Sequence, residues 1–119
     1  MGEKAAERDG PLYKLSQQAF KDGENWFPEV SHDLPHLVLG MCGEAGELAN
    51  LVKKLQRGDL TLKDADTRYR VMMETTDVLT YLLNIAGLIG LDLDQSLQHV
   101  RSENIKRFAN GKAVKHVRS

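Results

Sequence analysis

The sequence has little cysteine, little proline and no long apolar run. Its 119 residues include one cysteine and three prolines. Cys42 alone cannot form an internal disulfide, and we expect it to be inert packing. The first ten residues, MGEKAAERDG, lack the apolar core of a secretory signal. The most apolar stretch, VLTYLLNIAGLIGL, is too short and too polar to span a bilayer. These absences predict a cytoplasmic protein without a membrane partner.

Charge of one sign is also lacking. The formal net charge is -1, from 16 basic and 17 acidic residues. No overall positive field is therefore available to wrap a nucleic acid, and an anionic ligand must be held locally. The length fits one domain, which we place at residues 1–111, followed by a basic tail at 112–119 that we expect to be frayed.

Apolar residues after the last proline recur at helical spacing, with no alternating strand pattern, so the sequence predicts an all-α fold. Helices are expected at 11–21, from 33 to 58, from 63 to 90, and from Asp92 or Asp94 to Gly111, with Asp9 a candidate cap for the first. The segment GENWFPEVSH is expected to be a loop. Short links between helices favour an antiparallel four-helix bundle-like domain, completed by oligomerisation.

Acidic residues interrupt the apolar stripes of the second and third helices. Apolar neighbours surround Glu44 and Glu74 within roughly 80° on their helices, which predicts that both carboxylates point inward. Glu47 and Asp77 lie roughly 60° to the same flank. Unpaired ions in such a confined region cost several kcal/mol each, so either cations neutralise them or the acids protonate, and bound metal is the more economical explanation. Oxygen-only ligands select Mg²⁺ or Mn²⁺, and Mg²⁺ takes further ligands from substrate phosphates.

Several other residues accompany these acids. On the last helix, Asn104 is at the centre of an apolar stripe formed by Leu93, Leu97, Val100 and Phe108. Gly40 and Gly43 weaken a helix interior, which predicts close approach by a ligand or another helix. Trp26 and Phe27 either stack on a base or plug the bundle, and we favour the plug.

The segments GEAGEL and ETTDVL, followed by ENIKRF, resemble the three ordered elements of the MazG-like all-α nucleoside triphosphate pyrophosphohydrolases. The resemblance spans roughly residues 18–108 and implies Mg²⁺-dependent hydrolysis of an NTP or dNTP to the monophosphate and pyrophosphate, as in removal of surplus or noncanonical nucleotides. It also implies a homodimer or homotetramer. Carried over, the metal ligands are Glu44, Glu47, Glu74 and Asp77, one of them a possible general base. The substrate-binding candidates are Asn104, Arg107, Lys54, Lys106, His36 and Trp26, with Lys106 weaker because its helical angle points away from the stripe.

Four alternatives stay open. The acids can be an ordinary salt-bridged helix surface, or the enzyme can be a phosphoribosyl-ATP pyrophosphohydrolase of the same superfamily. A di-iron carboxylate bundle normally needs Glu-x-x-His pairs, which neither Glu44 nor Glu74 begins. A non-catalytic helical interaction module is the remaining alternative.

Overall fold

The computed structural model describes residues 8–109, which form four helices and no strand. They are α1 (Pro11–Trp26), α2 (Leu34–Arg57), α3 (Ala65–Ile89) and α4 (Leu93–Phe108). The predicted all-α, bundle-like fold class is therefore confirmed. The expected end of the last helix at Gly111 and the basic tail lie outside the described residues. Within the described range no single helix is long and apolar enough to cross a membrane, and only α3 and α4 taken together meet that test, across a 110° bend.

Short polar and glycine signals set the ends of α2 and α3 as predicted. The Asp33 side chain accepts a hydrogen bond from the backbone N–H of His36 at 3.1 Å, and Asp64 does the same for Thr67 at 3.3 Å. Each carboxylate satisfies an amide that the first helical turn leaves free. Gly58 and Gly90 end the two helices in the left-handed region, at φ 84° and 80°. These caps fix a long helical hairpin, α2–α3.

The first helix is longer than predicted. It continues to Trp26, so the expected end at Lys21 is wrong and the first residues of GENWFPEVSH are helical. Gly23 lies inside the helix, where an added Cβ would sit 3.0 Å from Asn84 Oδ1 of α3. Glycine at this position therefore makes room for a neighbouring helix rather than ending its own.

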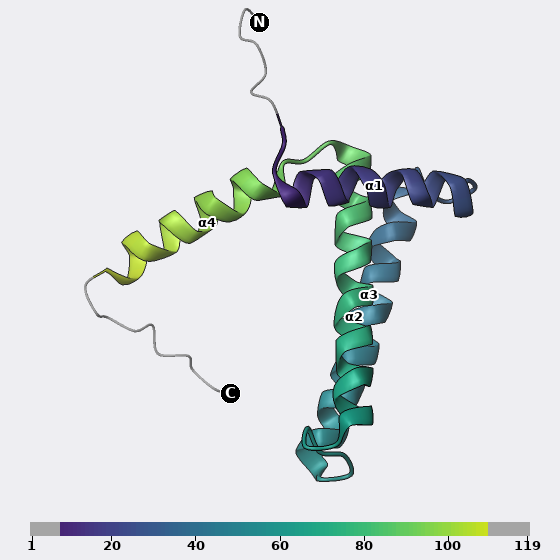
Figure 1. Cartoon of the computed structure of the whole chain (residues 1–119), viewed down its shortest axis with the longest axis vertical. Helices are drawn as coiled ribbons and strands as arrows, with labels where there is room; N and C mark the ends of the chain where they lie inside the picture. The colour runs from purple at the N-terminus through teal and green to yellow at the C-terminus, as the bar shows by residue number, and fades with distance from the viewer. Residues whose placement is uncertain (1–7, 110–119) are drawn as a thin grey trace, which may run out of the picture.

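Helix α1 lies across one end of the antiparallel α2–α3 hairpin (Figure 1). The buried apolar core of the described residues is small, consisting of Leu37, Leu51, Leu83 and Ala86. Small residues let α1 approach α3 closely, because a Cβ on Gly87 would collide with the Ser16 backbone oxygen and with Phe20. Helix α1 thus covers one end of the α2–α3 hairpin.

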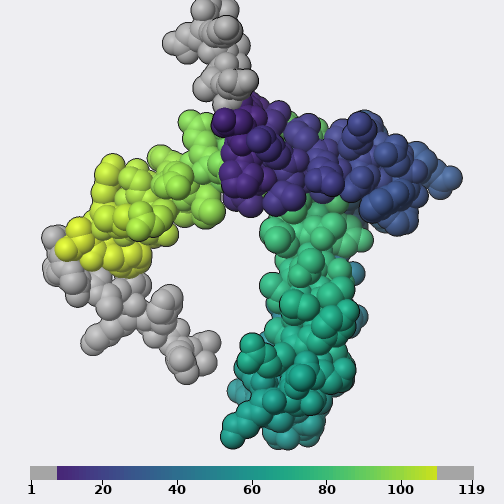
Figure 2. All heavy atoms as spheres, in the orientation of Figure 1, coloured from purple at the N-terminus to yellow at the C-terminus, as the bar shows by residue number. Residues whose placement is uncertain are grey.

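Helix α4 departs from the α3 axis by 110°, and within residues 8–109 its main contact with another helix is with α1. In the space-filling view α4 and the hairpin are separate arms that meet near α1 (Figure 2). No residue of α4 is buried. The expectation that Asn104 occupies an inward-facing stripe is therefore wrong for a single chain, because that stripe has no helix opposite it.

A side-chain cap explains the direction of α4. The Asp94 carboxylate, in the first turn of α4, accepts hydrogen bonds from the backbone N–H groups of Leu12 and Tyr13 at 3.1 and 2.8 Å. Gly10 supplies no side-chain cap to α1, so Asp94 does this from another helix. Asp9, the candidate from sequence, does not, and Asp92 caps α4 itself by accepting from Gln95 N–H.

Asp94→Ala is expected to lower the free energy of unfolding by about 1–2 kcal/mol, since two amides at the start of α1 lose their acceptor. Asp94→Asn retains an acceptor oxygen and should lose less. Urea unfolding followed by circular dichroism measures both. Equal stability of the alanine variant and the unchanged protein would show that Asp94 does not hold α1 and α4 together.

Candidate metal centre and adjoining cavities

Three of the four predicted metal ligands come together between the hairpin helices. Glu44 extends from α2, and Glu74 and Asp77 extend from α3, three residues apart on one face. One oxygen from each carboxylate lies within 4.8 Å of the others, and all three residues are half-buried. Helical angles from the sequence predict that Glu44 and Glu74 point inward and that Asp77 lies on the adjoining flank, and the antiparallel pairing of α2 with α3 brings all three to the same level. We refer to Glu44, Glu74 and Asp77 as the carboxylate cluster.

The carboxylate cluster holds uncompensated negative charge. Loss of water on burial raises the pKa of Glu44, and Asp77, a side-chain hydrogen bond to Glu74, and the charges of Glu74 and Glu47 raise it further. Glu74 Oε2 is buried and has no hydrogen-bond partner within the described structure. An unpaired buried acceptor costs free energy unless something binds it. No lysine, arginine or histidine of residues 8–109 forms an ion pair with the cluster.

The donor set fits a hard divalent cation. All the available atoms are carboxylate oxygens, which Mg²⁺ and Mn²⁺ prefer over softer ligands. The unpartnered oxygen belongs to Glu74, one of the three acids, so an ion bound at the cluster could satisfy this acceptor and reduce the mutual repulsion of the acids. These residues would leave several positions on the ion for water or for an anionic ligand.

Glu47, the fourth predicted ligand, is not part of the carboxylate cluster. It is exposed and lines a separate cavity of about 220 Å³ between α2 and α3, together with Lys54. Its offset of roughly 60° from Glu44 equals that of Asp77 from Glu74, so helical angle alone does not separate the acid at the rim from the acid in the cluster. The structure thus places Glu47 beside the cluster and next to a predicted phosphate-binding lysine.

A larger cavity of about 420 Å³ lies on the other side of the cluster, under the C-terminal half of α1. Trp26, Phe27 and His36 line it, along with Tyr81 and Asn84 of α3. Trp26 and Phe27 remain 67% and 62% exposed. They therefore do not plug the bundle in this chain, which corrects that expectation, and their rings are available at the mouth of an apolar cavity.

The helical glycines differ from each other. A Cβ on Gly40 would lie 2.4 Å from a ring carbon of Tyr81, so glycine allows this tyrosine to lie against α2, as the predicted close approach requires. At Gly43 no heavy atom of the described residues lies within 4 Å of the added carbon, and no close approach is found there. The absence of a side chain at Gly40 thus leaves room for Tyr81 at the wall of the larger cavity.

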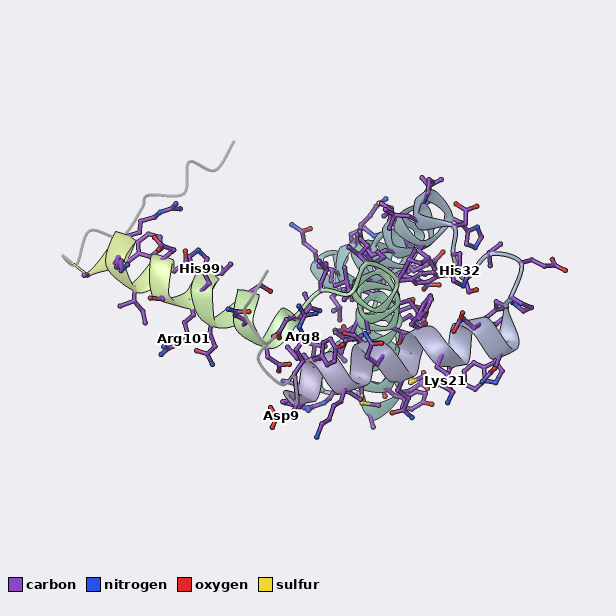
Figure 3. The ribbon with its side chains drawn as sticks, turned by 90° about the horizontal axis from the view of Figure 1, so that it is seen from above. Arg8, Asp9, Lys21, His32, His99 and Arg101 are labelled. Atoms are coloured by element: carbon purple, nitrogen blue, oxygen red, sulfur yellow. The ribbon has the colours of Figure 1, made fainter. Side chains whose placement is uncertain are left out.

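The predicted ligands on the last helix lie elsewhere in a single chain. Asn104, Lys106 and Arg107 are exposed on α4, which does not pack along the hairpin, and Lys106 pairs with Glu103 at 3.7 Å. Seen from above, α4 extends away from α1 and the hairpin, with His99 and Arg101 on opposite sides of it (Figure 3). One chain therefore does not bring these three residues to the carboxylate cluster.

Tyr81 and Arg70 are among the cavity-lining residues that were not singled out from the sequence. Tyr81 lines the larger cavity and Arg70 lines the smaller one. Both were detectable in principle, because Arg70 precedes Glu74 by four residues and Tyr81 follows Asp77 by four, which places each on the face of its acidic neighbour. Tyr81 also lies near Glu74 around the helix axis, so helical angle alone assigns it to the apolar stripe.

Magnesium is expected to stabilise the protein more as pH rises above 4.5, the ordinary pKa of Glu44. Because the folded-state pKa is raised, the folded chain binds this proton more tightly than the unfolded chain, and the stability that results is lost as pH rises through the raised value. Cation binding needs deprotonated carboxylates, so the stabilisation that Mg²⁺ provides increases as pH rises. At a Mg²⁺ concentration about 100 times Kd, Tm should rise by roughly 10 °C near neutral pH.

Thermal denaturation with and without Mg²⁺ over this pH range measures the effect, and Glu44→Gln is the matched variant. In that variant the metal-free loss of stability with pH should be smaller. A Tm that ignores Mg²⁺ at every pH would remove the carboxylate cluster as a metal site.

Comparison with known proteins gives limited information about this chain. No family model matches the sequence. The chain is similar to the Gene 37 protein of Mycobacterium phage L5, at 32% identity over 79 residues that cover 66% of this chain and 66% of that protein. The match thus spans slightly less than two thirds of the relative, whose name states no activity. Any function has to be argued from the residues of the site.

Proposed function

We propose that the protein hydrolyses a nucleoside triphosphate to the monophosphate and pyrophosphate in a Mg²⁺-dependent reaction. The observation that carries the proposal is the carboxylate cluster, in which one oxygen from each of three acids lies within 4.8 Å of the others and Glu74 Oε2 is buried without a hydrogen-bond partner among the described residues. A bound cation would relieve the repulsion between these like charges, which otherwise destabilises the fold. The proposal also agrees with the order of acidic motifs in the sequence.

The larger cavity supports a nucleoside as the organic part of the substrate. Its lining is mostly apolar, with the Trp26 and Phe27 rings largely exposed at its mouth. Aromatic rings stack on any base, and His36 and Asn84 supply polar groups that can contact its edge. A nucleoside bound here would present its phosphates toward the neighbouring carboxylates.

The carboxylate cluster would hold Mg²⁺ through Glu44, Glu74 and Asp77. When bound, Mg²⁺ neutralises charge on phosphate oxygens and acts as a Lewis acid. In the reaction a water oxygen forms a new bond to the α-phosphorus while the anhydride bond to the β-phosphate breaks and its electron pair leaves on pyrophosphate. A carboxylate at the site accepts the proton of the water, and Glu47, exposed at the rim, is one candidate.

The deciding assay incubates the purified protein with a panel of NTPs and dNTPs plus Mg²⁺ and measures monophosphate and pyrophosphate. We expect both products in equal amounts from at least one substrate, and none when EDTA is added. Failure with every nucleotide contradicts the proposal. Activity confined to phosphoribosyl-ATP would instead identify the related pyrophosphohydrolase of that substrate.

Self-association is expected because much apolar surface of the chain is uncovered. Large side chains 42–60% exposed line α4, namely Leu97, Val100, Ile105 and Phe108. A second copy of the chain could cover them and would bring Asn104 and Arg107 near another protein surface. Light scattering after gel filtration should give the mass of a dimer or tetramer, and Leu97→Lys with Phe108→Lys should lower it. A single-chain mass at micromolar concentration would contradict this expectation.

A further inference from the structure

The smaller cavity, beyond the carboxylate cluster, carries positive charge as well as negative. It has a volume of about 220 Å³ and lies between α2 and α3 on the side away from α1. The polar and aromatic residues that line it are Glu47, Asn50, Lys54, Tyr69, Arg70 and Glu74. Two basic side chains from opposite helices thus share a cavity with two acids, one of which belongs to the cluster.

Neither basic side chain is neutralised by its acidic neighbours. The ion pairs of residues 8–109 are His32–Glu24, Arg57–Asp59 and Lys106–Glu103, and none involves Lys54 or Arg70. An arginine guanidinium presents a planar set of donors that matches two oxygens of one phosphate, and a lysine supplies a further point charge. Since Glu47 and Glu74 leave both groups unpaired, their donors are free for an external anion.

The three features follow one another along the hairpin. Because α2 and α3 run antiparallel, the larger cavity adjoins residues 36–37 and 80–84, the carboxylate cluster adjoins 44 and 74–77, and the smaller cavity adjoins 47–54 and 69–74. Arg70 is one turn from Glu74, about 6 Å along the helix axis. The Lys54 side chain leans back toward Glu47, as side chains on a helix tilt toward its N-terminus. An elongated ligand that crosses the cluster would therefore meet an apolar cavity at one end and basic side chains at the other.

From this order we infer that the smaller cavity binds the terminal diphosphate of the substrate, which is released as pyrophosphate, and that Arg70 is a ligand of it beside Lys54, which the resemblance already implies. The inference rests on the proposed function and adds the direction of the substrate, with its nucleoside under α1 and its outer phosphates toward the loop between α2 and α3. Arg70 contacts the two phosphates that leave and not the α-phosphorus. It should therefore govern affinity for triphosphate and pyrophosphate more than the rate of the chemical step.

The test compares Arg70→Ala with Arg68→Ala, a variant of an exposed arginine two residues away that does not line the cavity. For Arg70→Ala we expect about a tenfold rise in KM and in the inhibition constant of pyrophosphate, which corresponds to the loss of one charge-assisted hydrogen bond. The kcat should change by less than about threefold. Arg70→Lys should recover part of the affinity, because it keeps the charge but not the planar donors. Arg68→Ala should match the unchanged protein.

Direct binding separates failure of this inference from failure of the proposed function. Isothermal calorimetry with inorganic pyrophosphate and Mg²⁺ needs no turnover, and Lys54→Ala serves as an independent second variant. Weaker pyrophosphate binding in both variants, even if no nucleotide is hydrolysed, would uphold an anion site and reject the enzyme. Active enzyme with unchanged KM and unchanged pyrophosphate inhibition in Arg70→Ala and Lys54→Ala would overturn the inference and leave the proposed function standing.

Discussion

Asp77→Asn is expected to reduce nucleotide hydrolysis by at least about 100-fold, because altering even the groups that support metal ligands costs 10–100-fold and Asp77 is placed to be a ligand itself. The substitution keeps the size of the side chain and one of its oxygens, so the helices should remain intact. It replaces a carboxylate oxygen that lies within 4.8 Å of those of Glu44 and Glu74. Steady-state kinetics at several Mg²⁺ concentrations measures the loss, and extra Mg²⁺ should restore little of it.

A second measurement on the same variant separates a lost site from a damaged fold. Asp77 is one of the charges that raise the pKa of Glu44, so removing it relieves repulsion in the metal-free protein. The free energy of unfolding without Mg²⁺ should therefore rise, while the stabilisation by added Mg²⁺ should shrink. Asp66→Asn, at an exposed position in the first turn of α3, is the control and should leave activity unchanged. Full activity of Asp77→Asn would remove this residue from the site.

Helical periodicity was sufficient to predict the carboxylate cluster because the relevant information is local. The angle of Glu44 on α2, and those of Glu74 and Asp77 on α3, follow from the rotation of about 100° per residue. Once two such helices pair through their apolar stripes, their inward acids face each other without further specification. The caps of α2 and α3, Asp33 and Asp64, are also local, since each acts within its own first turn.

The direction of α4 could not be obtained in this way. It depends on Asp94, which sits in the first turn of α4 but caps α1, eighty residues away in sequence. An aspartate in the first turn of a helix can cap that helix or accept hydrogen bonds from another one. Periodicity does not distinguish these two roles. The sequence predicts Asn104 at the centre of an apolar stripe, but a stripe alone does not say which surface covers it. In this chain none of α4 is buried.

The length of α1 illustrates a similar ambiguity of glycine. A glycine that follows an amphipathic run usually caps the C-terminus of the helix. Gly58 and Gly90 have this role, and both have positive φ. Gly23 instead lies inside α1 where Asn84 approaches. Only the packing of α1 on α3 distinguishes a glycine that ends a helix from one that admits a neighbour. The extra turn matters for function because it carries Trp26 to the larger cavity.

Gly87→Ala is expected to be the most destabilising single-carbon change in the hairpin. The added Cβ would lie 2.3 Å from the Ser16 backbone oxygen and 2.6 Å from Phe20 Cβ, and neither atom can move without shifting α1 as a whole. Overpacking of this kind costs about 1–3 kcal/mol. Ser16 of α1 is fully buried at the same crossing, so little free space is available there. Because α1 also forms one wall of the larger cavity, the KM for nucleotide should rise together with the loss of stability.

Gly46→Ala provides a matched control on α2. The same change is made in a helix interior, but no heavy atom of the described residues lies within 4 Å of the added carbon. Alanine favours helix over glycine by about 0.5–1 kcal/mol, so this variant should be more stable than the unchanged protein. The two substitutions are thus expected to change the free energy of unfolding in opposite directions. The difference between them measures how tightly α1 packs on α3, with the intrinsic helix preference of alanine removed. If both variants gain stability in urea unfolding, α1 does not pack on α3 at Gly87, and the wall that it forms over the larger cavity has to be placed elsewhere.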